Sequence, residues 1–411
     1  MLAFQYYNPV MVYFENGVHK KIGQYLKGKY KKILLVSAKG PFRDNGLYAE
    51  IKAQLQKTGA DVFEMSDIDS NPKMYSVYEG IKIATDNEID CMVALGGGSA
   101  MDCTKLMAMS AKTGIDPYEY VWGSRPEVTE SIDTVMIPTI AATGTELNNT
   151  AVVVDEKTKD KSWCFTAFPR YCFMDPEITA SLPKTMTIWG AMDILSHTFE
   201  YYFNGYTGSE FQLCFSEALI SATMTTIEKL VQNPKDIDAR GEILWCSTMT
   251  WGTGLTKIGR KDAEMTCHNI EERVSGYFDT HHGGGLGVIT PRWMCLAMTR
   301  EPAIFARFAR KVMGIDCADD KEAAGLGVSA FNEWLKKIGA PLKFSDLSDA
   351  VVFSDEELLL VAEKIWKVCK GQIGKLTPMS FEDIKSILLA GKDELNPLDY
   401  VQNIRNGEVL Q

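Results

Sequence analysis

Histidine is rare in this chain, and most of its copies lie near the middle of the sequence. The five are His19, His197, His268, His281 and His282. Asp193 precedes His197 by four residues, so the two side chains share one face if this segment is helical. A carboxylate and imidazoles with an open coordination position suit Fe²⁺ or Zn²⁺ acting as a Lewis acid. These residue types predict a divalent-metal site, with His281 as an alternative to His282.

An aspartate and a histidine four residues apart occur by chance on many helices, so this pair alone does not establish a site. His268 and His282 add two more ligand candidates, and a glycine-rich loop elsewhere in the chain strengthens the combination. His19 lies in a segment with Lys20 and Lys21, and we expect it on the surface with no function.

The glycine-rich loop follows a short apolar run directly. Gly96, Gly97, Gly98 and Ser99 come after the strand-like 90–95, and a helical segment with Asp102 and Lys105 follows. Glycines let a backbone approach a pyrophosphate closely, and a helix N-terminus offers unpaired N–H groups. The loop therefore predicts a nucleotide site, although a tight strand-to-helix turn is the alternative. Its pattern is neither G-x-G-x-x-G nor that of a P-loop.

A second polar loop, residues 138–148, follows another apolar run. Thr139, Thr143 and Asn148 could hydrogen-bond a phosphate or a ribose. Taken alone, an ordinary connecting loop explains this segment better.

The elements that must position these residues alternate in the first half of the chain. Strand-like runs at 32–37, 61–65 and 90–95 are separated by helical segments near 47–55 and 77–85. This βαβαβ order predicts a doubly wound α/β nucleotide-binding sheet. Further strands are expected at 134–138, 150–155 and 171–175.

The second half reads as helical. Helices are expected at about 187–204, 208–232, 238–252, 302–313, 320–338, 354–370 and 381–390. We place a domain boundary near residue 182, which gives a dinucleotide-binding α/β domain at 1–182 and an all-helical metal and substrate domain at 183–411.

Composition narrows the possible partners. The net charge is −11, which argues against nucleic acid or an anionic membrane as the main partner. None of the ten cysteines forms a C-x-x-C pair, and most lie in apolar runs, which is typical of reduced thiols in the cytoplasm. Neither a signal peptide nor a membrane span is expected.

Taken together, the motifs resemble those of the iron-containing (group III) alcohol dehydrogenases, especially the butanol dehydrogenase branch, over about residues 5–390. The matching motifs are Gly96–Lys105, Thr139–Glu146, Asp175–Pro176, Gly190–Glu200 and His282–Pro291.

The resemblance implies an α/β dinucleotide-binding domain and a helical domain in a dehydroquinate synthase-like fold, with the active site in the cleft between them, and a homodimer. It implies four metal ligands: Asp193, His197, His268 and His282. The cofactor contacts that we expect are Gly96, Gly97, Gly98, Ser99, Asp102, Thr139, Thr143, Asn148, Lys161, Ser37 and Lys39.

The chain departs from the family pattern beside the expected metal. Relatives carry a histidine four residues after the third ligand, and here that position is Glu272. Relatives also have a tryptophan just before His268, and residues 260–267 hold one extra residue. We expect Glu272 to line the active site without binding the metal and to affect the pH dependence of turnover. The alternatives are that it binds the metal or that it is displaced to the surface.

The turn after the first expected strand also differs from the family pattern. An acidic residue normally accepts the ribose 2′-hydroxyl there, but this turn carries Ser37, Ala38 and Lys39, with Arg43 nearby and no carboxylate before Asp44. We therefore expect a preference for NADP(H) over NAD(H).

These expectations define an NAD(P)-dependent oxidoreductase that transfers a hydride between the cofactor and a small primary alcohol or aldehyde resembling butanol or butanal. The metal would lower the pKa of the alcohol oxygen or polarise the carbonyl. The alternatives are a polyol dehydrogenase or lyase of the same superfamily, or a catalytically impaired nucleotide-binding homologue.

Overall fold

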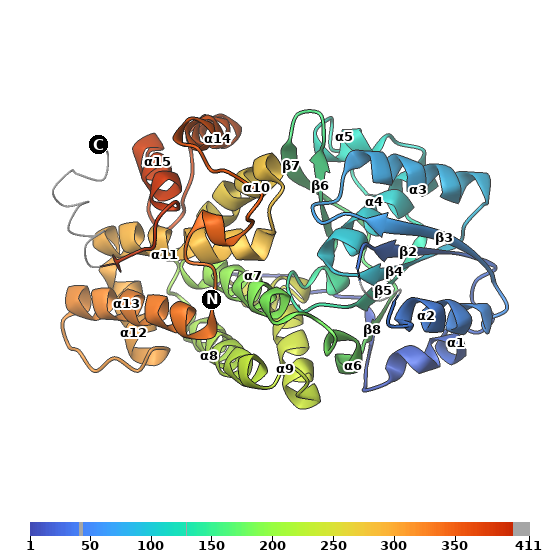
Figure 1. The fold of residues 1–411 in the computed structure, drawn as a ribbon, viewed down its shortest axis with the longest axis horizontal. Coiled ribbons are helices and arrows are strands. Elements are labelled where there is room, and N and C mark those ends of the chain that lie inside the picture. Colours follow the sequence, from blue (N-terminus) through green and yellow to red (C-terminus); the bar gives the residue numbers. More distant parts are fainter. Residues whose placement is uncertain (41–43, 129, 398–411) are drawn as a thin grey trace. The chain divides into compact units, whose positions relative to one another are not determined.

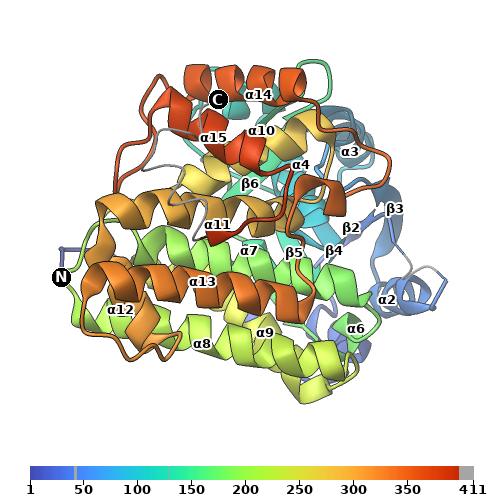
Figure 2. The same cartoon turned by 60° about the vertical axis from the view of Figure 1, so that its left-hand side comes forward.

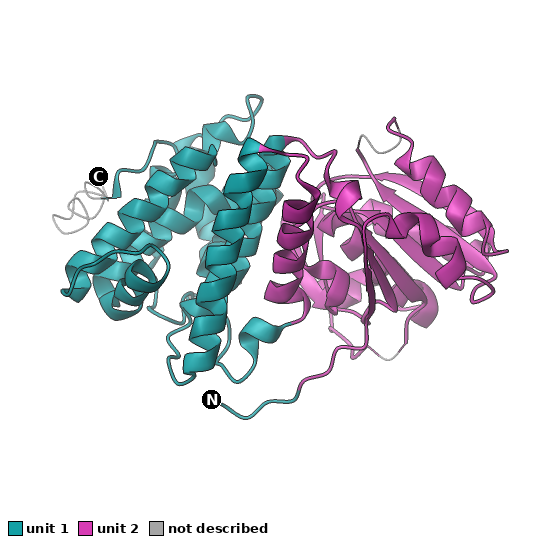
Figure 3. Cartoon of the chain, turned by 90° about the horizontal axis from the view of Figure 1, so that it is seen from below, with its two compact units in different colours: residues 1–5, 184–232, 254–411 teal, residues 6–183, 233–253 magenta. Residues whose placement is uncertain are grey.

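The chain forms two compact units in the computed structural model, which describes residues 1–40, 44–128 and 130–397. Unit 2 contains residues 6–183 and 233–253, and unit 1 contains residues 1–5, 184–232 and the chain from 254 onward (Figure 3). The segment 233–253 therefore packs with the first part of the chain, although helices of unit 1 flank it in the sequence.

Unit 2 is built on a parallel sheet of six strands in the order β1-β8-β5-β4-β2-β3. The strands are β1 (Met11–Phe14), β2 (Lys32–Ala38), β3 (Asp61–Ile68), β4 (Cys91–Gly96), β5 (Asp133–Pro138) and β8 (Tyr171–Met174). β6 (Thr150–Asp155) pairs antiparallel with β7 (Asp160–Phe165) in a separate two-stranded sheet.

Helices cover both faces of the six-stranded sheet (Figure 1). Alternating side chains of β2 show how the core divides: Ile33 and Leu35 join the cluster of α1 and α2, whereas Leu34 and Val36 join that of α3 and α4. A strand buried on both faces must be apolar throughout, which explains the continuous apolar run. The helices of unit 2 are α1 (Ile22–Tyr25), α2 (Leu47–Gln56), α3 (Met74–Asp86), α4 (Gly98–Thr113), α5 (Pro117–Val121), α6 (Pro176–Thr179) and α9 (Ile237–Ser247).

Short helices complete unit 2. The 3₁₀ helices η1 (Val18–Lys21) and η2 (Thr145–Leu147) precede α1 and β6, and the π-helical turn η3 (Thr248–Gly252) ends α9.

Unit 1 is helical, and α7 and α11 pack against each other and against several of its other helices. Figure 2 shows α7, α8, α11 and α13 side by side. Aromatic side chains fill the core of unit 1, where Phe203 stacks on Phe305 at a ring-centroid distance of 4.5 Å. Its elements are α7 (Lys184–Tyr202), α8 (Glu210–Gln232), η4 (Leu255–Lys257), α10 (Thr266–Phe278), α11 (His282–Arg300), α12 (Pro302–Lys311), α13 (Asp320–Ile338), η5 (Phe344–Asp346), α14 (Asp355–Val368) and α15 (Phe381–Ala390).

The expected α/β and helical architecture is confirmed, but α10 and α11 were not anticipated. His268 lies on α10 and His282 on α11. Among the described helices, none combines the length and the apolar character that crossing a membrane would require. No disulfide joins the ten cysteines, all of which lie in the described part of the chain, and seven of them are buried.

Candidate functional site

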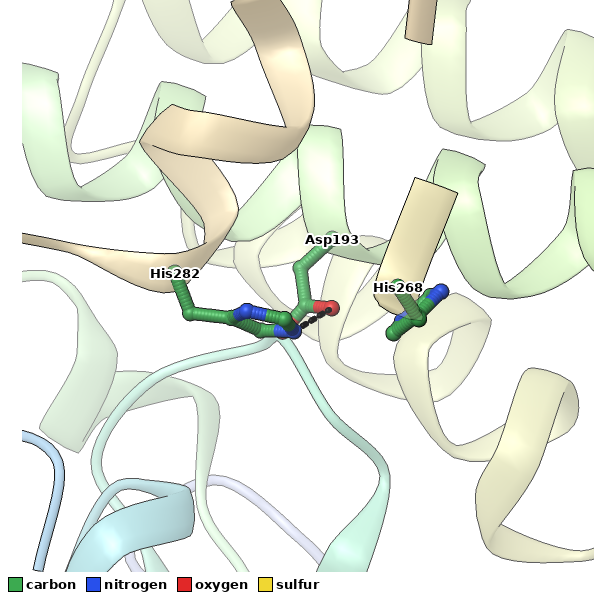
Figure 4. Close-up of side chains that lie close together, drawn as sticks. All are labelled: Asp193, His268 and His282. Atoms are coloured by element: carbon green, nitrogen blue, oxygen red, sulfur yellow. Dashed lines mark ion pairs between the residues drawn. The ribbon is translucent and has the colours of Figure 1, made fainter. Parts of the chain in front are cut away.

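Three ligand candidates from three helices of unit 1 meet at one point. Asp193 of α7, His268 of α10 and His282 of α11 each offer an atom, and these atoms lie within 4.8 Å of one another (Figure 4). Between α11 and α7, His282 Nε2 lies 4.0 Å from Asp193 Oδ1. His268 and His282 follow Asp193 by 75 and 89 positions in the sequence, so the packing of the three helices brings these side chains together.

His197 lies beside this group, one helical turn after Asp193. Its Nδ1 is 3.1 Å from Asp193 Oδ1, and its ring centroid is 4.6 Å from that of His268. The expected fourth ligand therefore borders the cluster of three.

Two carboxylates hold the histidines from behind. Glu200 accepts a hydrogen bond from His268 Nδ1 at 2.7 Å, which leaves Nε2 with no hydrogen-bond partner among the described residues. Glu271 contacts Nδ1 of His282 in the same way. A carboxylate on one ring nitrogen fixes the imidazole orientation and makes the other nitrogen a better metal ligand. We did not anticipate either role, although Asp193, His197 and Glu200 follow a 4-then-3 spacing on α7 that marks one helix face.

The glycines after His282 allow the close packing that forms the cluster. A β-carbon at Gly283 would lie 2.2 Å from the carbonyl oxygen of Trp189 on α7, and one at Gly285 would lie 2.3 Å from Glu271 Oε1. Larger residues would force α11 away from α7 and from the carboxylate that contacts His282.

His281 and His19 lie elsewhere. His281 is the N-cap of α11, and its Nδ1 accepts a hydrogen bond from Gly284 N at 3.4 Å. The expectation that His19 is a surface residue is wrong: it is 5% exposed and lies between Asp175 and Glu50 in unit 2. Two carboxylates make a buried imidazole tolerable there.

Glu272 is buried on α10, one turn after His268. It is 6% exposed and forms an ion pair with Arg273, which is 7% exposed. The surface position that we considered for Glu272 does not occur.

The glycine loop lies at the carboxyl end of β4 in unit 2. α4 begins at Gly98, and no side chain caps its N-terminus at Gly97. A β-carbon at Gly97 would lie 2.8 Å from Ile140 Cγ2, and one at Gly98 would lie 2.9 Å from Thr143 Cγ2. The two polar loops are therefore packed against each other, and Gly97, Gly98 and Ser99 remain half-buried.

The other expected cofactor residues differ in their surroundings. Thr139 donates its N–H to Gly96 O at 3.0 Å, so it is tied to the glycine loop. Asp102 and Asn148 hydrogen-bond within the protein. Lys161 donates to Asn71 Oδ1 at 2.9 Å.

Ser37 and Lys39 lie at the end of the second strand and just beyond it. Ser37 is fully buried, whereas Lys39 is exposed. Arg43 lies outside the described residues.

Comparison with known proteins matches both halves of the chain. Residues 9–176 fit the model "Iron-containing alcohol dehydrogenase", and residues 187–390 fit "Fe-containing alcohol dehydrogenase family, C-terminal". A Bacillus subtilis protein described as a probable NADH-dependent butanol dehydrogenase is 33% identical over 395 residues, which is 95% of this chain and 100% of that protein. The chain belongs to the iron-containing alcohol dehydrogenase family.

Two further members of the family resemble the chain over nearly its full length. NADH-dependent butanol dehydrogenase A of Clostridium acetobutylicum is 31% identical over 391 residues, covering 94% of this chain and 99% of that protein. The crystal structure of NADH-dependent butanol dehydrogenase A from Thermotoga maritima superimposes with a TM-score of 0.89 at 31% identity, covering 96% of this chain and 99% of that one. The expected butanol dehydrogenase branch is confirmed, and the chain is an alcohol dehydrogenase of the iron-containing type. Nothing in the comparisons favours a lyase, a polyol dehydrogenase or an impaired homologue.

Burial and neighbouring charges shift the pKa values of two histidines at the cluster in opposite directions. Burial and the positive charges of His268 and His282 hold the pKa of His197 well below its usual range. Burial also opposes the charged form of His268, but the hydrogen bond and charge of Glu200 raise its pKa above the ordinary value. A site that attracts a proton to a buried imidazole also attracts a metal ion, for which the proton competes.

Proposed function

We propose that this chain interconverts small primary alcohols and aldehydes with NAD(P)(H), at a divalent-metal site held by Asp193, His268 and His282 with His197 at its border. The observation that carries the proposal is the buried His268, whose Nδ1 is held by Glu200 and whose Nε2 has no hydrogen-bond partner in the described structure. Two imidazoles and a carboxylate match the ligand preferences of Fe²⁺ and Zn²⁺.

The protein residues have separate tasks in this chemistry. Glu200 and Glu271 fix the ring orientations of His268 and His282. The metal, when bound, supplies Lewis-acid polarisation of the substrate oxygen, and the nicotinamide supplies the hydride. At the glycine loop, the N-terminus of α4 offers backbone N–H groups and a positive dipole end to the pyrophosphate.

The adjacent histidines of α11 provide the test. His282→Ala should lose the metal and the oxidation of NADH by butanal, whereas His281→Ala removes the cap of α11 and its contact with Trp189 and should keep both. Metal content is measured by elemental analysis on proteins purified in parallel. Full metal occupancy in His282→Ala, with loss in His281→Ala, would overturn the ligand assignment.

We further propose that Glu272 lines the site without binding the metal. Its burial one turn after His268 supports a place near the cluster, and its ion pair with Arg273 supports a carboxylate that is already engaged. Glu272→Gln should then keep the metal content and change the turnover rate. Loss of the metal would refute this assignment, because Glu272 would then contribute to metal binding as a ligand or through its charge; an unchanged rate would remove it from the chemistry.

We propose that both nicotinamide cofactors are accepted, with NADPH preferred. The exposed Lys39 in a turn without a carboxylate supports binding of a 2′-phosphate, whereas the names of the relatives support NADH. Comparing kcat/KM for the two cofactors decides between them, and a clear preference for NADH would refute the assignment.

We also propose a homodimer in the cytoplasm. The resemblance supports the dimer, and the buried cysteines support a reducing compartment. Light scattering and cell fractionation test the two statements separately.

A further inference from the structure

A lysine that follows a glycine-rich loop invites the interpretation that it binds phosphate, but Lys105 points inward. It is 1% exposed, and its Nζ donates to Thr145 O at 3.0 Å, Thr145 Oγ1 at 2.5 Å and Asn148 Oδ1 at 3.0 Å. An ammonium group has three donors, so all of them are used inside the protein. Lys105 has none left for a ligand.

Asp102, on the same helix, contacts both Lys105 and Thr145. Its Oδ1 lies 3.5 Å from Lys105 Nζ and accepts from the Thr145 hydroxyl, and its Oδ2 accepts from Val152 N at 2.9 Å. The buried positive and negative charges compensate each other, as a buried ion pair requires. Both therefore fasten the start of η2 to α4.

The same loop is held from the opposite side by η3. Glu146 accepts a hydrogen bond from Thr248 Oγ1 at 2.8 Å. Gly144 has a φ of +66°, and a β-carbon at Gly252 would lie 2.5 Å from Gly144 O. Here backbone meets backbone, so neither glycine can be enlarged without moving the loop. π-helical turns such as η3 are frequent at functional sites.

The loop that contains Gly144 and Thr145 packs on the glycine loop through Thr143. Thr145 N donates to Thr143 Oγ1 at 3.2 Å, and Thr143 packs on Gly98 at the start of α4. A displacement of Thr145 therefore moves Thr143 over the site proposed for the pyrophosphate.

We infer that Lys105 and Asp102 are positioning residues, which set the width of the cofactor site by holding Thr145 and, through it, Thr143 against the glycine loop. The inference rests on the proposed cofactor role of that loop. It reassigns Asp102 and Asn148 from cofactor contacts to supports of the loop.

The test is the dissociation constant of NADH, measured by fluorescence titration over a range of salt concentrations. Lys105→Met should weaken binding by about 10-fold, because holding the loop in place on binding would then lack at least one buried hydrogen bond. Lys112→Met, at an exposed position of the same helix, should bind like wild type. Steady-state kinetics should show a raised KM for NADH with a smaller change in kcat, and the metal content of unit 1 should stay unchanged.

Gly252→Ala displaces the loop from the other side and keeps the inference testable if Lys105→Met fails to fold. It should weaken NADH binding with the same salt dependence as wild type. A direct phosphate contact by Lys105 predicts instead that Lys105→Met flattens the salt dependence of NADH binding while Gly252→Ala keeps it; a flattened dependence in Lys105→Met overturns the inference. Wild-type affinity in both folded variants also overturns it. A wild-type protein that binds neither NADH nor NADPH would refute the proposed function itself.

Discussion

Replacing Glu271 by glutamine tests whether carboxylates behind the histidines set the metal affinity. Glu271 is fully buried, contacts His282 Nδ1, and accepts a hydrogen bond from the Ser275 hydroxyl at 3.2 Å. Glutamine keeps the size of the side chain and an acceptor oxygen, but it removes the negative charge. The imidazole should keep its orientation and become a weaker electron donor.

The expected loss follows from the kind of contact that is changed. Residues that orient metal-bound histidines usually contribute about 10- to 100-fold in metal affinity, equivalent to about 1.4–2.7 kcal/mol. Glu271→Gln should lie near the lower value because a neutral hydrogen bond remains. Glu271→Ala should approach the upper value because it removes the contact and leaves space beside Gly285.

Glu272→Gln is the matched control, since it removes a neighbouring charge that contacts Arg273 instead of His282. The metal dissociation constant is measured by competition with a chelator, and thermal unfolding of the metal-free variants checks that each is folded. Equal affinities for Glu271→Gln and wild type would refute the argument. So would an equal loss in both glutamine variants, because then total charge and not contact with His282 would matter.

Three further substitutions have outcomes set by the same structure. Burial lowers the pKa of His19, but Asp175 and Glu50 outweigh burial and raise this pKa above 6.5. Protonated His19 should therefore stabilise the fold fully below pH 6.5, and this stabilisation should disappear as the pH rises through the raised pKa. Denaturant titrations of wild type and His19→Gln measure the difference in the free energy of unfolding, and a difference that does not change with pH would contradict the argument. Gly285→Ala should displace Glu271 and weaken metal binding, whereas Gly325→Ala, with open space around it in the described structure, should leave chelator competition unchanged. Lys39→Glu should lower kcat/KM for NADPH more than for NADH, and an equal fall would exclude a 2′-phosphate contact.

The centre of the parallel sheet was predictable because β2 and β4 are buried on both faces and therefore carry long apolar runs. α11 was not predictable in this way. It contains three consecutive glycines and Pro291, and in isolation each glycine costs about 1 kcal/mol and the proline about 3 kcal/mol relative to alanine. Packing against α7 and Glu271 overrides these local preferences, and periodicity does not reveal which distant helix will require small residues.

Residue types predicted the site better than they predicted side-chain direction. Asp193, His268 and His282 could be chosen as candidates because few types of side chain ligate metals, whereas their convergence comes from the packing of α7, α10 and α11. Whether Asp102 faces a ligand or the interior depends on Lys105 of the same helix and on Thr145, which meets both from a separate loop. Glu200 and Glu271 were missed for the same reason, since a carboxylate on a buried helix face is informative only when its partner is known.

The return of segment 233–253 to unit 2 has a consequence for how this protein can be divided or recombined. A gene fragment that stops at residue 183 would encode every strand of the nucleotide-binding sheet yet lack Thr248 and Gly252, on which Glu146 and Gly144 rest. Exchanging halves between homologues at that point would pack the loop that contains Gly144 and Glu146 against the segment 233–253 of the other parent. A chimera should therefore take residues 233–253 from the same parent as residues 6–183, even though this requires two additional junctions.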